Sequence, residues 1–198
     1  MNSITTGGGD LGDTGILGSD RLQKCHPRIE AYGAVDELNS DLGVCISMIP
    51  SSNLSSSDSS SPSIPIAIES QLREMQSMLF HMGADLAQQD CGLEGRASPR
   101  VGQPQVDLLT GWIHQWEAEL PPLKEFILPG GDPIGAQLHR ARTTGRRAER
   151  RTVAFSGSSG EGKSAVVVLN RISDLLFLQA RVVNLSLGHP DRPWKSGT

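Results

Sequence analysis

The stretch HRARTTGRRAERR, residues 139–151, places six arginines and one glutamate in thirteen positions of a chain that is acidic overall. Just upstream, Asp132 followed by Pro133 is typical of a helix start, because aspartate caps the first turn and proline fits the first helical position. The pattern therefore predicts a helix over roughly 133–155. So much positive charge on one helix must meet counter-charge from its neighbours or bind an anion.

This predicted helix has two charged faces separated by a thin apolar one. At 100° per residue, one charged face carries Arg142, Arg146, Glu149 and Arg150. The other charged face carries Arg140, Arg147 and Arg151. The apolar face between them consists of Leu138, Ala141, Gly145 and Ala148. The small residues of the apolar face allow a neighbouring helix to approach closely. Arginines four residues apart destabilise an isolated helix by roughly 0.2–0.5 kcal/mol per pair, so opposite charge is expected nearby.

Two interpretations of the arginines remain open. They can form ion pairs with other helices on a solvated face, or they can hold an anion at the edge of a packed helix contact. Arginine suits phosphate, because its planar guanidinium bonds two oxygens at once and stays charged at any relevant pH. A polyphosphate ligand is the leading hypothesis for this site.

Four further segments show apolar residues at steps of three and four, which is typical of helices: 27–49, 66–88, 105–120 and 164–188. Prolines mark the start of the first segment and the end of the third. The start of the last is open, because AVVVL within it would also suit a buried strand. Almost no alternating pattern occurs elsewhere, so the sequence predicts an all-α, up-and-down five-helix bundle. Trp112 and Trp116 are expected in its core.

The other segments read as loops. Residues 1–26 are rich in Gly, Asp and Thr and predict an ordered loop or a flexible tail. The Ser-rich, low-complexity segment 51–63 predicts a mobile connector, and a Gly/Pro-rich break over 92–104 ends the second helix. The 198 residues suit one domain with a sizeable core, so we take 1–198 as a single domain.

Composition argues against several classes of protein. A formal net charge of -4 disfavours binding to nucleic acid or anionic membranes, and with it a non-enzymatic helical module that would use the arginines for that purpose. Three widely spaced cysteines without a CxxC pair indicate neither a disulfide framework nor a zinc site. No signal-peptide pattern or apolar run of about 18 residues occurs. We expect a cytoplasmic protein with no nucleic-acid and no membrane partner.

Two glycine-rich stretches could bind phosphate. GSSGEGKS, residues 157–164, matches the Walker A motif, and a P-loop-type NTPase is therefore kept as the alternative function. That motif needs a buried strand before it, whereas here the arginine helix precedes it, so an interhelical turn is favoured. TTGGGDLGDTGILGSDRLQK, residues 5–24, offers unhindered backbone N–H groups and Lys24, although a mobile terminus is its simpler interpretation.

Four stretches taken together resemble the PduO-type ATP:cob(I)alamin adenosyltransferases. In the family's order they are GDLGDTGILGSDRLQK, RIEAYGAVDELNSDLG, FILPGGDPIGAQLHRARTTGRRAER and LNRISDLLFLQAR. The resemblance implies a ferritin-like, cobalamin adenosyltransferase-like bundle that assembles as a homotrimer with active sites between subunits. It also implies transfer of the 5′-deoxyadenosyl group of ATP to the cobalt of cob(I)alamin, which forms adenosylcobalamin and releases triphosphate.

The resemblance also assigns roles to single residues. It puts ATP against Thr6, Gly7, Gly8, Gly9, Thr14, Gly15, Lys24, Arg146, Arg147, Glu149, Arg150 and Asn170. It pairs Asp36 with Arg142 across the subunit interface, and it lets Phe126 close the lower face of the corrin. The assignment of Arg147 follows the family motif, although the helical wheel places it on the other charged face. Asp174 and Arg181, on the same stripe as Asn170, are expected to be structural.

The implied chemistry needs no general base, because cob(I) is itself a strong nucleophile. The protein aligns the reactants and stabilises the leaving triphosphate, for which Arg146 and Arg150 are the first candidates and Mg²⁺ is the expected metal ion. A cob(II)alamin reductase and an adenosylcobalamin-dependent enzyme are the expected partners. One departure stands out: Gly7 and Gly8 occupy positions where the family's TRTGD motif has Arg and Thr, which puts a side-chain contribution there in doubt.

Overall fold

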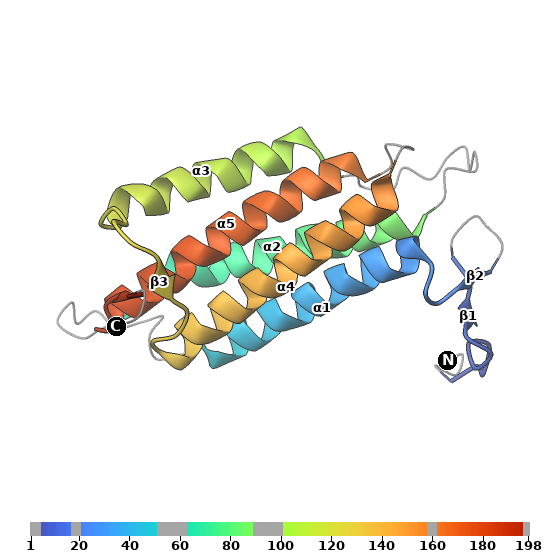
Figure 1. The fold of residues 1–198 in the computed structure, drawn as a ribbon, viewed down its shortest axis with the longest axis horizontal. Coiled ribbons are helices and arrows are strands. Elements are labelled where there is room, and N and C mark those ends of the chain that lie inside the picture. The colour runs from blue at the N-terminus through green and yellow to red at the C-terminus, as the bar shows by residue number, and fades with distance from the viewer. Residues whose placement is uncertain (1–4, 17–20, 51–62, 89–100, 158–161, 196–198) are drawn as a thin grey trace.

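The computed structural model describes residues 5–16, 21–50, 63–88, 101–157 and 162–195, and these form a bundle of five helices (Figure 1). The helices are α1 (Pro27–Met48), α2 (Ile66–Ala87), α3 (Gln103–Glu119), α4 (Pro133–Ser156) and α5 (Lys163–Ser186). Consecutive helices run in opposite directions, which confirms the predicted all-α, up-and-down fold. Most of the connector predicted over 51–63 and most of the break over 92–104 lie outside the described residues.

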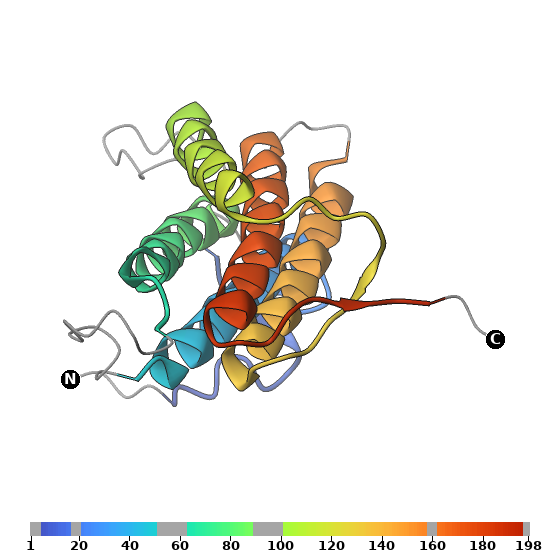
Figure 2. The ribbon, with the colours of Figure 1, turned by 90° about the vertical axis from the view of Figure 1, so that its left-hand side faces the viewer.

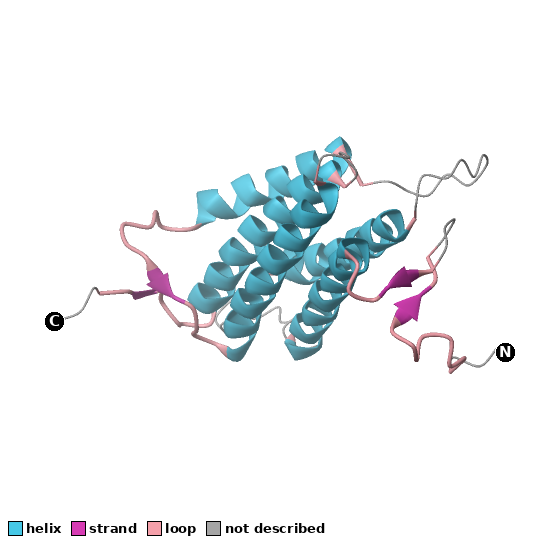
Figure 3. Cartoon of the chain, turned by 45° about the vertical axis from the view of Figure 1, so that its right-hand side comes forward, coloured by secondary structure: helices cyan, strands magenta, loops and turns pink. Residues whose placement is uncertain are grey.

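Four strands of two residues each were not anticipated. β1 (Asp13–Thr14) pairs antiparallel with β2 (Leu22–Gln23) just before α1. β3 (Ile127–Leu128), in the connection between α3 and α4, pairs antiparallel with β4 (Arg192–Pro193) after α5. The two pairs lie at opposite ends of the bundle (Figures 1 and 3).

Helix starts follow the local sequence. The Asp132 carboxylate accepts a hydrogen bond of 2.8 Å from the backbone N–H of Ile134, and Pro133 occupies the first turn of α4 as predicted. α5 begins at Lys163 after Gly162, which has a left-handed backbone with φ 74°. The AVVVL run is therefore helical, and the strand alternative for it was wrong.

The small residues of α4 allow it to pack closely between α1 and α5. Leu138, Ala141 and Ala148 are fully buried, and a Cβ at Gly145 would lie 3.6 Å from Leu38 of α1. Viewed along the bundle, α4 lies between these two helices while α3 covers the other side of α5 (Figure 2). The thin apolar face read from the sequence is thus the contact surface of this helix.

Acidic residues of α1 supply counter-charge to one of the two charged faces of α4. Arg140 lies 3.3 Å from the carboxylate of Asp41, and Arg151 lies 3.5 Å from that of Glu30. Arg147 forms the third ion pair, with Glu37. Asp41 is only 4% exposed and also accepts a hydrogen bond of 2.7 Å from the Thr144 hydroxyl. The ion-pair interpretation therefore holds for Arg140, Arg147 and Arg151.

A buried amide joins three helices in the core. The side-chain oxygen of Gln71 accepts hydrogen bonds from Trp116 Nε1 at 2.8 Å and from Gln179 Nε2 at 2.9 Å. Trp116 is fully buried as predicted, whereas Trp112 is only partly buried. None of the described helices has the length and apolar character needed to cross a bilayer.

Asn184 of α5 fixes the turn that leads into α4. Its Oδ1 accepts from the backbone N–H of Asp132 at 2.9 Å, and its Nδ2 donates to the carbonyl of Gly130 at 2.8 Å. The amide fills the space beside Gly131, whose φ is 102°, and beside Gly135, where a Cβ would overlap it. Glycine is required at both positions for this close contact.

We expect Gly135→Ala to destabilise the fold by about 1–3 kcal/mol, because the new methyl group would displace the Asn184 amide. Gly111→Ala is the matched control, since a Cβ at this exposed position of α3 would meet nothing within 4 Å. Removing a glycine from an exposed helix interior should stabilise the protein by about 0.5–1 kcal/mol. Urea unfolding measures both, and equal effects of the two substitutions would contradict the Asn184 contact.

Candidate functional site

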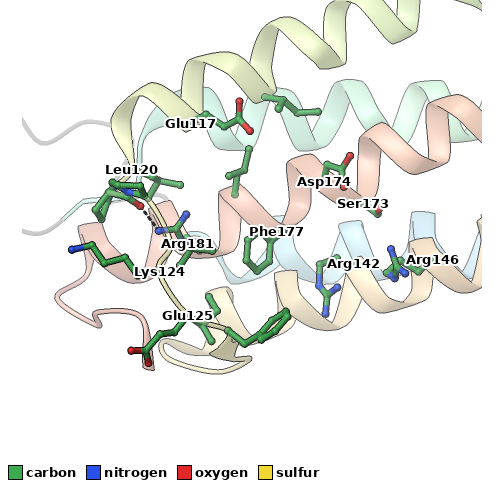
Figure 4. Close-up of a pocket in the computed structure, with 17 residues that line it drawn as sticks. Glu117, Leu120, Lys124, Glu125, Arg142, Arg146, Ser173, Asp174, Phe177 and Arg181 are labelled. Atoms are coloured by element: carbon green, nitrogen blue, oxygen red, sulfur yellow. Dashed lines mark hydrogen bonds between the residues drawn. The ribbon is translucent and has the colours of Figure 1, made fainter. Parts of the chain in front are cut away.

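A pocket of about 1020 Å³ lies between α3, α4, α5 and the segment that connects α3 to α4 (Figure 4). Its lining combines two arginines of α4, the aromatic ring of Phe177 and the exposed ring of Phe126. The other residues that line it are Ile113, Glu117, Leu120, Pro121, Pro122, Leu123, Lys124, Glu125, Ile127, Ser173, Asp174, Leu178 and Arg181. The pocket is large enough for a substantial part of a ligand that is both apolar and anionic.

Arg142 and Arg146 place positive charge on the α4 wall of the pocket. No ion pair to either occurs among the described residues, in contrast to the three arginines that face α1. Burial, and then the charge of Arg146, lower the pKa of the Arg142 guanidinium from its usual value, and its Nε has no hydrogen-bond partner in the described part of the chain. Two neighbouring cations that form no ion pair in the described chain favour an anionic ligand, and the nearby Asp174 carboxylate offsets only part of their charge.

The aromatic wall faces these cations. Phe177 projects from α5 toward α4, and the Arg142 guanidinium carbon lies 5.9 Å from its ring centroid (Figure 4). Phe126 is 82% exposed, which is unusual for so large an apolar side chain. Its backbone is nevertheless held, because the Phe126 carbonyl accepts a hydrogen bond of 2.7 Å from the Trp194 N–H beside the β3–β4 pair. The ring is thus presented to the pocket mouth by a fixed backbone.

Of the polar residues along α5, Asp174 and Arg181 both line the pocket, but Arg181 is also held in hydrogen bonds to other parts of the chain. Arg181 is buried, and it donates to Asp191 at 2.8 Å and to the Pro121 carbonyl at 2.8 Å, which is the structural behaviour expected of it. Asp174 lines the pocket, and burial raises the pKa of its carboxyl although Arg171 and Arg146 oppose the shift. The position of Asp174 at the pocket was not anticipated.

Asn170, Glu149 and Arg150 lie farther along α4 and α5, toward the β1–β2 end of the bundle. The Asn170 amide donates to Glu149 at 3.5 Å, and its oxygen accepts from Arg171 at 2.6 Å. Arg150 is exposed one turn beyond Arg146. Glu149 and Arg150 continue the face of α4 that carries Arg142 and Arg146, here called the unpaired face because no ion pair to these arginines occurs in the described chain, whereas Arg147 pairs with Glu37 of α1.

The N-terminal loop is far from the pocket within one chain. Thr6 to Gly9, Thr14, Gly15 and Lys24 belong to the loop and hairpin at the β1–β2 end, whereas Phe126 lies near the β3–β4 end (Figures 1 and 3). Asp36 is exposed on α1, and no ion pair between it and Arg142 occurs in the described chain. The structure thus unites Phe126, Arg142 and Arg146 in one pocket and leaves the loop residues and Asp36 outside it.

The Walker A match has the wrong surroundings. The residues before it belong to α4, which ends at Ser156, and Lys163 begins α5. Residues 158–161 of the motif lie outside the described residues, but the described segments on both sides are helical and not a strand of a parallel sheet. This geometry argues against the P-loop alternative.

Comparison with known proteins identifies the family of this chain. The family model described as cobalamin adenosyltransferase matches residues 4–183. The chain belongs to the cobalamin adenosyltransferase family. It is 39% identical over 182 residues to a corrinoid adenosyltransferase of Citrobacter freundii, which covers 92% of this chain and 95% of that protein. It is 36% identical over 195 residues to the cobalamin adenosyltransferase of Cupriavidus metallidurans, which covers 98% and 95%.

Solved structures of this family share the fold over their full length. The chain matches a phenylalanine-to-alanine variant of the PduO-type ATP:corrinoid adenosyltransferase from Lactobacillus reuteri, complexed with cobalamin and ATP, with a TM-score of 0.85 and 34% identity. The match covers 98% of this chain and 100% of the Lactobacillus reuteri chain. An arginine-to-lysine variant of the same enzyme, complexed with ATP, matches with a TM-score of 0.84 and 33% identity over the same shares.

His139 of α4 is buried against Phe177, a residue of the pocket wall, and this position predicts a pH-dependent stability. The side chain is 4% exposed, with its ring centroid 5.9 Å from that of Phe177. Burial, and then the charge of Arg142, lower its pKa below the ordinary 6.5, although Asp191 opposes the shift. A lowered histidine pKa gives stability that is complete above pH 6.5 and is lost as pH falls toward the folded-state pKa, because protons then bind preferentially to the unfolded chain.

We therefore expect His139→Gln to flatten the dependence of stability on pH below about 6.5. The control is His81→Gln, because His81 is exposed on α2. Urea midpoints measured across this range should fall as steeply for the control as for the unsubstituted protein. A His139→Gln profile parallel to that of the unsubstituted protein would show that this histidine does not set the slope.

Proposed function

We propose that this protein transfers the 5′-deoxyadenosyl group of ATP to the cobalt of cob(I)alamin and releases triphosphate. The observation that carries the proposal is the pocket lined by Phe126, Phe177, Arg142 and Arg146, in which neither arginine forms an ion pair in the described chain. An apolar and cationic surface of this kind suits a corrin ring beside a polyphosphate. The names of the relatives, and the ATP and cobalamin in the Lactobacillus reuteri complex, support the same two substrates.

The reaction explains why the pocket needs no catalytic base. The electron pair of cob(I) attacks C5′ of ATP, the cobalt–carbon bond forms, and the C5′–O bond breaks with its electrons on the leaving triphosphate. No proton is transferred in this step. The residues must align the cobalt with C5′ and stabilise charge on the departing oxygen, which is the effect of preorganised cations. Arg146 and Arg150, one turn apart on the unpaired face of α4, are assigned to the triphosphate.

The aromatic residues act on the other substrate. Phe126, held at the pocket mouth by the Trp194 N–H, is assigned to the lower face of the corrin, where an apolar ring excludes water and an axial ligand. Removal of that ligand makes reduction from cob(II) easier. A cob(II)alamin reductase is accordingly a partner in this proposal, as is an adenosylcobalamin-dependent enzyme that receives the product.

The distance between the loop and the pocket supports a homotrimer with active sites between subunits. Thr6 to Gly9 and Lys24 lie at one end of a chain and Phe126 at the other, so one chain does not bring them together (Figure 3). In the assembly, the loop of one subunit would meet the arginine helix of its neighbour, and Asp36 would pair with Arg142 across the contact. The roles of Thr14, Gly15, Arg147, Glu149 and Asn170 at ATP belong to this arrangement.

Mg²⁺ fits this site as a companion of the nucleotide. No group of three or more metal-ligating side chains occurs among the described residues. Magnesium is commonly held by one or two carboxylates together with substrate phosphates, and Glu149 is the carboxylate on the unpaired face of α4. Glu149 is thus the residue that would hold the ion, which would neutralise charge on the triphosphate.

Anaerobic incubation with ATP, Mg²⁺ and chemically reduced cob(I)alamin tests the proposed activity. We expect the absorbance spectrum to change to that of adenosylcobalamin, with one triphosphate released per product. Mixtures without ATP or without protein are the controls. Folded protein that gives no product under these conditions would refute the proposed function.

Arg146→Ala should lower kcat/KM about a hundredfold or more, since one preorganised donor to the charge of a transition state is typically worth that much. Arg151→Ala is the matched control on the same helix, because Arg151 pairs with Glu30 of α1 and should change activity less than about threefold. Lys163→Ala should also have little effect. Loss of activity in Lys163→Ala with activity kept in Arg146→Ala would instead favour the P-loop alternative.

A further inference from the structure

Arg21 is fixed against the glycine loop by a two-point contact with Asp13. Its Nε donates to Asp13 Oδ2 at 2.9 Å, and one terminal nitrogen, Nη2, donates to Oδ1 at 2.9 Å. The same nitrogen also donates to the Gly8 carbonyl. A guanidinium held along one edge in this way has a defined plane, so the direction of its remaining N–H groups is defined too.

The remaining nitrogen of Arg21, Nη1, is free in the described part of the chain. It lies 3.9 Å from the place that a Cβ at Gly8 would occupy, and Lys24 Nζ lies 3.1 Å from the corresponding place at Gly9. Gly7, Gly8 and Gly9 present backbone without side chains here, and the Lys24 side chain lies directly against Gly9. Arg21 itself is exposed, with 48% of its side chain accessible.

The loop that carries this arrangement is ordered by its own backbone. Gly7 has a φ of 68°, and its carbonyl accepts from the Asp10 N–H at 3.2 Å. The Gly12 N–H bonds the Gly9 carbonyl at 3.2 Å, and the Lys24 N–H bonds the Gly12 carbonyl at 2.9 Å. The glycines and the two cations therefore form one hydrogen-bonded unit with the β1–β2 hairpin.

We propose that Arg21 binds the triphosphate of ATP together with Lys24, and that it supplies the cationic side chain that Gly7 lacks. The inference rests on the proposed function and names a further binding residue for it. Asp10 and Asp13 balance the formal charge of Arg21 and Lys24, so attraction by net charge is not the basis of the site. The basis is a guanidinium that Asp13 orients, with a free N–H edge beside backbone that carries no side chains.

Substitutions of Arg21 and of Asp13 distinguish phosphate binding by Arg21 from a purely structural role of this arginine. Arg21→Gln removes the positive charge. Asp13→Asn weakens the two-point contact that orients Arg21 but keeps the positive charge. Arg73→Gln is the matched control. Arg73 is an exposed arginine of α2 that pairs with Glu69 at 2.7 Å, so its substitution also removes one surface ion pair. Calorimetric titration of each full-length protein with ATP and with inorganic tripolyphosphate gives the dissociation constants.

Arg21→Gln should weaken binding of both ligands about tenfold or more, the usual effect of losing a charged hydrogen bond. Asp13→Asn should weaken them less than about threefold, and Arg73→Gln should match the unsubstituted protein. Arg21→Lys keeps the positive charge but lacks the planar guanidinium. A loss of affinity in Arg21→Lys that is smaller than that in Arg21→Gln, but larger than zero, supports hydrogen bonding by an oriented guanidinium. Equal losses in Arg21→Gln and Asp13→Asn, or none in Arg21→Gln, would overturn the inference.

The parent protein separates failure of this inference from failure of the proposed function. If the parent binds neither ATP nor tripolyphosphate, both are overturned. If it binds ATP and forms adenosylcobalamin while Arg21→Gln binds both ligands like the parent, only the role of Arg21 is overturned. Unfolding curves of the variants show whether each is folded. If Arg21→Gln does not fold, the affinity of Arg21→Lys for the two ligands decides the question.

Discussion

The close contact of α4 with α1 and α5 is the constraint on which the site depends. Ala141, Gly145 and Ala148 let α4 approach its neighbours, and the contact divides the arginines of one helix between two environments. Those beside α1 meet carboxylates and stabilise the bundle. Those on the other side have no such partners in the described chain and remain available to a ligand. A Cβ at Gly145 would just reach Leu38, so a side chain longer than that of alanine would press on α1 and disturb both sets together.

Much of the fold could be predicted from the sequence, because apolar spacing, prolines and the Asp132 cap are local signals. The short strands could not, since two-residue pairs such as that of Ile127 with Pro193 depend on contacts between distant segments. Contacts between distant segments also limited what could be predicted of the site. The arginine faces followed from helix geometry, whereas the ion pairs with α1 and the contact of Arg21 with Gly8 required the folded chain.

Family motifs and helix geometry gave different answers for Arg147. The motif assigns it to ATP, but the helical wheel and the ion pair with Glu37 place it on the α1 side. Both hold if the N–H groups of Arg147 that do not bond Glu37 contact the nucleotide, or if Glu37 releases the arginine in the assembly. The assignments of Arg142 and Arg146 meet no such conflict, because these residues already line the pocket with Phe126 and Phe177.

The connection that carries Phe126 is tied down at both ends by one helix. Arg181 holds the carbonyl of Pro121, and Asn184 holds Gly130 and Asp132. An exposed aromatic ring on a free loop would lose much conformational entropy when a ligand ordered it. Here folding has already restricted the backbone of the connection, so contact with a planar ligand can contribute more of its interaction free energy to binding. The preorganisation comes from two polar side chains that need never touch the ligand.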